Sequence, residues 1–152
     1  MDQLQEQAKP AVADLLDADE DQLFEKLGIL EQAGKQNPSI LASFSADISY
    51  NADAMGVLDD VRNIGKRFFD GISRDCYKLV CSDDAENSEE RNKVISAFGI
   101  GKTEVAAALA ALLVSQFTLA PAIAAVAAAL IVKLVFRNAH SAMCTVWKEK
   151  IA

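Results

Sequence analysis

The sequence has few of the residues on which catalysis and covalent scaffolds depend. Its 152 residues include one histidine, three cysteines, three prolines and one tryptophan. Three cysteines are too few for a disulfide-rich scaffold. Acid–base or nucleophilic catalysis would have to rely on one histidine, because no carboxylate pair stands out in the sequence. The net charge of −7 argues against general nucleic-acid binding, which relies on lysine and arginine. We therefore expect a protein that is not an enzyme and that uses no cofactor and no nucleic acid.

Convincing period-two alternation is also missing, which argues against a sheet. Apolar residues instead recur every three or four positions, as they do on one face of a helix. The clearest case predicts a helix of about seven turns, with an apolar face made of Val57, Val61, Ile64, Phe68, Ile72, Cys76 and Leu79. Because this spacing recurs along the chain, the sequence predicts an all-α protein.

Several helix boundaries follow from capping residues. Acidic side chains in residues 17–21 suit the positive end of a helix dipole, and Gly34 offers a stop for the same helix. The pair Asn37-Pro38 predicts the start of the next helix. Asn87 and Glu90 have the spacing of a capping box and predict a further start.

Charge is distributed unevenly along the chain. Residues 1–101 contain 20 acidic and 10 basic side chains, whereas residues 102–152 contain 2 acidic and 5 basic ones. No residue between 105 and 132 is charged, and 12 of these 28 residues are alanine. We therefore divide the chain into an acidic domain of amphipathic helices (1–101), an Ala-rich hydrophobic helical hairpin (102–137) and a short basic amphipathic helix (138–152).

A break near residue 119 is the reason for expecting a hairpin. Residues 102–118 and 120–137 would form helices about 25 and 27 Å long, and Pro121 lies where the second helix would begin. The candidate membrane-inserting or core residues are Leu109, Leu112, Leu113, Phe117, Leu119, Pro121, Ile123, Val126, Leu130 and Ile131. The charges that flank the hairpin are Lys102, Glu104, Lys133 and Arg137.

The hairpin geometry makes a specific prediction about these charges. Antiparallel legs centred on Leu119 would bring Glu104 level with residues 133–137. We therefore expect Glu104 to face Lys133 or Arg137. We also expect that residues 105–132 do not form one straight helix.

The segment at residues 99–103, GIGKT, resembles the end of a phosphate-binding loop. That loop needs an earlier glycine at position 96, which is Ser96, and it needs a strand before it. We expect a connector between two helices instead, with Thr103 as the cap of the second, and no nucleotide.

Three aspartates match the first ligand positions of a calcium-binding EF-hand loop, namely Asp17, Asp19 and Asp21. The glycine at position six and the glutamate at position twelve are replaced by Gln22 and Gly28. An acidic helix N-terminus accounts for these residues without calcium.

Cysteine and histidine occur in the right number for a Cys₃His zinc site, with Cys76, Cys81, His140 and Cys144. His140 and Cys144 share a helical face, but Cys76 and Cys81 point about 140° apart on a continuous helix. The start of the chain lacks the features of a signal peptide, so we expect a reducing environment. The sequence therefore predicts three thiols, a pairing of the two Cys-bearing helices in the core, and no metal.

The uncharged hairpin supports two hypotheses of different class. In the first, the acidic domain shields the hairpin until it enters a bilayer, as a monomer or a pore-type oligomer. The ten large apolar residues between 112 and 132 contribute roughly −3 to −6 kcal/mol on insertion scales. In the second, the hairpin is the buried core of a soluble interaction or adaptor module. The first predicts a self-associating protein on the cytoplasmic side of a membrane, and the second a soluble cytoplasmic protein whose partner is another protein.

Overall fold

The computed structural model describes residues 2–45, 48–81 and 89–151. All regular elements in these residues are helical, which confirms the all-α prediction. In chain order they are α1 (Asp2–Leu16), α2 (Glu20–Gln36), the 3₁₀ helix η1 (Pro38–Leu41), α3 (Ala52–Met55), α4 (Leu58–Cys81), α5 (Glu89–Ala97), α6 (Lys102–Phe117), α7 (Pro121–Val135) and α8 (His140–Ile151).

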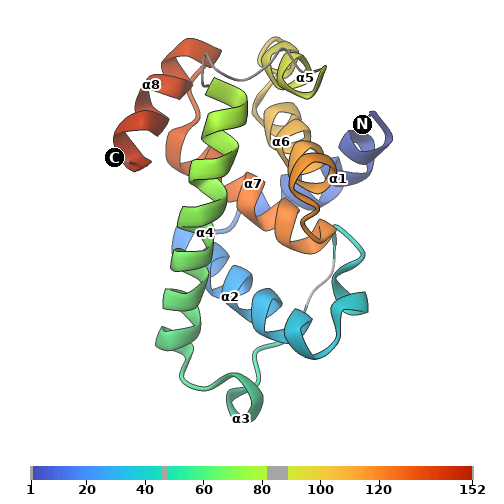
Figure 1. Ribbon diagram of the computed structural model, residues 1–152, viewed down its shortest axis with the longest axis vertical. Helices are drawn as coiled ribbons and strands as arrows, with labels where there is room; N and C mark the ends of the chain where they lie inside the picture. Colours follow the sequence, from blue (N-terminus) through green and yellow to red (C-terminus); the bar gives the residue numbers. More distant parts are fainter. Residues whose placement is uncertain (1, 46–47, 82–88, 152) are drawn as a thin grey trace.

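Helix α7 runs through the centre of the bundle (Figure 1). It contacts α1, α2, α4, α6 and α8, while α6 is covered by α1 and α5. We call the five helices around the α6–α7 pair the sheath: α1, α2, α4, α5 and α8. The core of the molecule therefore lies around the uncharged segment, and the amphipathic helices surround it.

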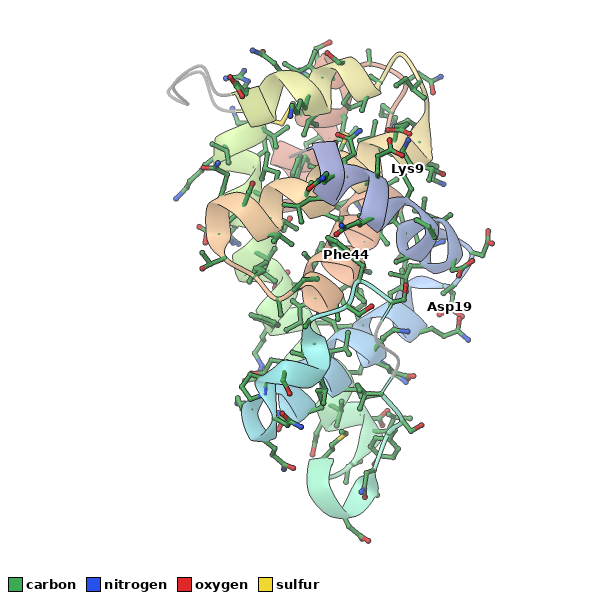
Figure 2. All side chains as sticks on the ribbon, turned by 90° about the vertical axis from the view of Figure 1, so that its right-hand side faces the viewer. Lys9, Asp19 and Phe44 are labelled. Atoms are coloured by element: carbon green, nitrogen blue, oxygen red, sulfur yellow. A yellow bond between two sulfur atoms is a disulfide. The ribbon has the colours of Figure 1, made fainter. Side chains whose placement is uncertain are left out.

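The start of α2 is capped as the acidic sequence indicates. The Asp19 carboxylate accepts from the Gln22 backbone N–H at 2.8 Å, and the Gln22 side chain accepts from the Asp19 N–H at 3.1 Å. Asp19 lies at the turn between α1 and α2 (Figure 2). This reciprocal pair is a capping box, which satisfies two N–H groups that the helix leaves unpaired. It confirms the interpretation of this segment as a helix N-terminus.

The predicted stop at Gly34 is wrong, because α2 continues to Gln36. A Cβ atom on Gly34 would come within 2.4 Å of the Leu41 side chain. The glycine therefore makes room for η1 rather than ending the helix. The segment after Asn37-Pro38 is also shorter than an α-helix, since η1 makes one 3₁₀ turn. The Asn37 side chain accepts from the Ser39 hydroxyl at 2.7 Å and makes no capping bond to the backbone.

The long helix α4 extends almost as the apolar spacing predicts. Its buried face is formed by Val61, Gly65, Phe69, Ile72, Ser73, Cys76 and Val80. Three residues of the predicted face are only half-buried, namely Ile64, Phe68 and Leu79. Val57 precedes the helix and is exposed. The predicted start at Asn87 lies outside the described residues, and α5 is described from Glu89 onward.

The bounds of α1 were not predicted. This helix buries Ala8, Ala11, Val12 and Leu15 against the hairpin, and it contains Pro10. The apolar spacing was present in the sequence, but a proline at the middle of a segment weakens the expectation of a helix. The omission matters because α1 supplies the polar partners at the base of the hairpin.

Candidate functional site

The candidate site is the hairpin formed by α6 and α7. The two helices contact each other and are separated by residues 118–120, so residues 105–132 are not one straight helix, as predicted. Thr118 ends α6 with a positive φ of 52°, and its N–H bonds to the Leu113 carbonyl. Pro121 is the first residue of α7, where its missing N–H has no cost.

The body of the hairpin is enclosed, whereas its tip is not. The buried candidate residues are Leu109, Leu112, Leu113, Ile123, Val126, Leu130 and Ile131. The three at the tip, Phe117, Leu119 and Pro121, are half-buried. A surface hollow of about 330 Å³ lies beside the tip, and α4 lines its opposite side with Phe68, Gly71, Ile72 and Asp75. The tip is therefore the part of the uncharged segment that lies closest to solvent.

The charges at the base of the hairpin do not pair as predicted. Glu104 forms an ion pair with Lys9 and accepts from Gln5 Nε2 at 2.8 Å. Figure 2 shows Lys9 on α1 beside the start of α6. Lys133 instead donates to the Leu16 carbonyl at the end of α1, at 3.0 Å. The prediction that Glu104 faces Lys133 or Arg137 is wrong because α1 lies against both legs and supplies their partners.

The ion pair at this base shifts the pKa of both partners. The hydrogen bond from Lys9 lowers the pKa of Glu104, although partial burial acts in the opposite direction. The hydrogen bond to Glu104 raises the pKa of Lys9. The other two flanking charges are exposed: Lys102 at the start of α6, and Arg137, which donates to the Phe136 carbonyl at 2.7 Å.

The GIGKT segment connects α5 to α6, as predicted, but its cap differs. Gly101, not Thr103, takes the cap position, because α6 already begins at Lys102. Gly101 has a φ of +153°, and its N–H bonds to the Ala97 carbonyl at 3.1 Å.

The prediction of three thiols is wrong. Cys81, the last residue of α4, forms a disulfide with Cys144 of α8, and their Cα atoms are 5.6 Å apart. Cys76 is a buried free thiol whose pKa is raised by burial. The predicted pairing of the Cys-bearing helices is confirmed, since α8 contacts α4. That contact brings together two cysteines 63 positions apart, which no local spacing could reveal.

His140 lies at the same junction, at the start of α8. Its Nε2 is 3.0 Å from the Val80 carbonyl and 3.5 Å from Cys144 Sγ. The imidazole also makes an edge contact with Phe98, with ring centroids 5.9 Å apart. Three of the four residues considered for a zinc site therefore meet, and Cys76 is not one of them.

Helix α8 covers α7, and side-chain contacts as well as the disulfide fix it to α4. Met143 and Trp147 are buried, and Trp147 Nε1 donates to the Ser73 hydroxyl at 2.9 Å. Tyr77 meets the Trp147 ring edge-on, with centroids 5.7 Å apart. Because Trp147 is the only tryptophan, its fluorescence reports whether α8 is docked.

Comparison with known proteins gives no relative for this chain. No known protein family matches it, and neither do curated proteins or solved structures. Within the described residues, no single helix has the length and apolar character for a full membrane crossing. Helices α7 and α8 meet these criteria as a pair, and they are bent by 96° where they join.

Proposed function

We propose that this chain is a non-enzymatic protein that stores the α6–α7 hairpin inside its sheath and inserts it into a membrane when the sheath opens. The observation that carries the proposal is the uncharged segment 105–132, whose two helices are apolar on every side. A helix at the surface of a bundle has a polar face, whereas a helix that is apolar all round needs either protein or lipid around it. Such a hairpin can exchange one apolar environment for the other.

The contacts between hairpin and sheath support this exchange. The polar contacts described above lie at the base, where α1 holds Glu104 and Lys133. Partly exposed ion pairs contribute little to stability, so separation of α1 from the hairpin has a small electrostatic cost. The tip is the least enclosed part. We infer that the tip enters the bilayer first.

The lengths of the legs favour a hairpin that enters and returns on the same side. Helices of 16 and 15 residues are about 24 and 22 Å long, which is shorter than the hydrocarbon core of about 30 Å. Such legs fit a shallow, re-entrant insertion or a locally thinned bilayer. Alanine-rich faces also allow several hairpins to pack closely, which would produce a pore-type oligomer.

The complete burial of the hairpin body favours a second candidate function. A chain whose central helix is surrounded by other helices can be a stable soluble bundle with no membrane-bound state. It would then act as an interaction or adaptor module whose partner is another protein. Among the described residues, three large apolar side chains are exposed and would be available to such a partner: Val57, Ile95 and Ile100.

A matched pair of variants separates the two functions. Val12 of α1 and Val126 of α7 are both buried valines, the first in the sheath and the second in the hairpin. Aspartate at either position buries an unpaired carboxylate and destabilises the closed bundle. Only Val126→Asp also places a charge at mid-bilayer depth, which costs about 2.5–3.5 kcal/mol on the insertion scale.

The measurement is flotation with phosphatidylcholine–phosphatidylglycerol vesicles, together with circular dichroism and proteinase K digestion. If the hairpin inserts, Val12→Asp floats more than the wild type, stays helical and protects a fragment around residues 102–137. Val126→Asp loses flotation by roughly a hundredfold, the factor that corresponds to the insertion penalty. If both variants unfold without protecting any fragment, the membrane proposal is overturned.

The cellular location stays a prediction. Insertion from the cytoplasmic side predicts that the protein sediments with membranes and resists a carbonate wash. Recovery of all of it in the soluble fraction, in unstressed cells and after sheath opening by Val12→Asp, would contradict the membrane proposal.

A further inference from the structure

We infer that Cys81, His140 and Cys144 form, in the reduced protein, a binding site for a borderline-soft divalent metal ion such as Zn²⁺. One ligand atom from each residue lies within 4.8 Å of the other two. Thiolate sulfur and imidazole nitrogen are the donors that zinc prefers in proteins. This inference does not depend on the proposed membrane function.

One pair of donors already has the separation of a tetrahedral site. With Zn–S near 2.3 Å and Zn–N near 2.0–2.1 Å, a tetrahedron separates S and N by about 3.6 Å and two sulfurs by about 3.8 Å. His140 Nε2 and Cys144 Sγ are already 3.5 Å apart. They are four residues apart on one face of α8, the spacing by which helices present two ligands to one metal.

The third donor, Cys81, comes from α4. Its Cα lies 5.6 Å from that of Cys144, so both thiolates can reach one ion after their sulfurs separate to about 3.8 Å. A set of two cysteines and one histidine leaves the fourth position to water, as in Cys₂His zinc sites. Cys76, the remaining candidate, is a fully buried thiol and is not needed.

The site exists only after the disulfide is reduced. A dithiol reductant supplies two electrons and two protons, so Cys81 and Cys144 become thiols and the reductant becomes a disulfide. The metal ion then binds two thiolates and releases two protons to solvent. His140 binds through Nε2, which gives up its contact with the Val80 carbonyl, while Nδ1 carries the proton.

The consequence is that one junction can be held in two ways. In oxidising surroundings the covalent bond fixes α8 to α4, and in reducing surroundings the metal ion does so. Both keep Trp147 and Met143 docked in the core. The metal would therefore replace the disulfide as the link that keeps α8 over α7.

Cobalt binding tests the inference directly. The protein is reduced with a phosphine, desalted without oxygen and titrated with Co²⁺, and the thiolate-to-cobalt charge-transfer absorption is recorded. Reduced wild type should bind one equivalent, which one equivalent of Zn²⁺ displaces, and unreduced protein should show no such band. Cys81→Ser and Cys144→Ser should lose it. His140→Gln, which keeps both thiols, should weaken binding at least tenfold.

Cys76→Ser is the matched control, because it removes a thiol from the same helix without changing the proposed ligands. It should bind Co²⁺ like the wild type, with circular dichroism confirming that each variant is folded. Absence of the band in reduced wild type overturns the inference. So does a loss in Cys76→Ser equal to the loss in Cys144→Ser, or unchanged affinity in His140→Gln.

Discussion

The helix pairs α2–α4 and α6–α7 lie in the same bundle but are specified in different ways. The first pair meets through glycine. A Cβ on Gly28 would lie 2.1 Å from the Val61 carbonyl oxygen, and one on Gly65 would lie 2.1 Å from the Phe24 carbonyl oxygen. The two backbones therefore approach so closely that neither position has space for one methyl group.

Directional contacts add to this specificity. Arg62 Nε donates to Glu25 at 3.0 Å across the two helices, and this hydrogen bond raises the pKa of Arg62. Phe24 meets Phe69 edge-on, with centroids 5.6 Å apart. Such contacts are made with one partner in one orientation. Helices α2 and α4 are therefore specific partners of each other.

The pair α6–α7 is built from alanine and branched apolar side chains, with polar residues between 105 and 132 confined to Ser115, Gln116 and Thr118 near the tip. Burial of such side chains is favourable in any apolar surroundings and is not directional. The comparison indicates that α2 and α4 specify each other as partners, whereas α6 and α7 require only apolar surroundings. This difference is what permits the proposed exchange of protein for lipid.

The largest expected effect concerns the covalent link between α4 and α8, the helix that covers α7. Cys81→Ala with Cys144→Ala opens a loop of 63 positions, which costs about 4 kcal/mol in the chain-entropy model. Urea unfolding measures this loss, and Trp147 fluorescence shows whether α8 undocks first. Reduced, metal-free wild type should behave like the double variant. An equal loss of amide protection in α2 and in α8 would show that α8 does not open separately from the α2–α4 pair.

The next-largest effect is expected from disruption of the close contact between α2 and α4. Gly28→Ala forces two backbones apart, and we expect a loss of about 3 kcal/mol in the free energy of unfolding. Gly71→Ala is the control in α4, because a Cβ there meets nothing within 4 Å. It should be neutral or stabilise by about 0.5–1 kcal/mol through helix propensity. Similar results for both glycines would mean that the close approach does not specify the pair.

A smaller effect is expected on the hairpin side. Ile131→Leu keeps the apolar volume of a fully buried residue in α7, and such exchanges cost less than about 1.5 kcal/mol. Urea unfolding of this variant beside Gly28→Ala tests the contrast between the two pairs. A loss as large as that of Gly28→Ala would show that the hairpin, too, depends on one detailed packing arrangement.

The positions of the helices were easier to predict from the sequence than the contacts between them. The extent of α4 and the start of α7 at Pro121 depend on local chemistry, and both were predicted. Gly65 was missed because a residue without a side chain adds nothing to an apolar pattern, although its backbone lies against that of α2 with no space for a Cβ. The partner of Glu104 and the Cys81–Cys144 bond depend on how α1 and α8 pack, and no local spacing contains that information.

The smallest effect tests the polar contacts at the base of the hairpin. Glu104→Gln removes the ion pair with Lys9, which joins α1 to α6. Because the pKa of Glu104 is lowered from 4.5, the pair stabilises the fold above that pH, and its contribution is lost as pH falls through the folded value. Because the pKa of Lys9 is raised from 10.5, the contribution is also lost at high pH, as pH rises through its folded value.

The difference between wild type and Glu104→Gln should therefore be largest between these two limits and should vanish in strong acid. Urea midpoints at neutral pH and near pH 2 measure it. Glu6→Gln is the matched control, because Glu6 also pairs with Lys9, at 2.7 Å, but belongs to the same helix. It should change the midpoint less, since it removes no contact between helices. A difference for Glu104→Gln that persists unchanged into strong acid would show that its origin is packing rather than charge.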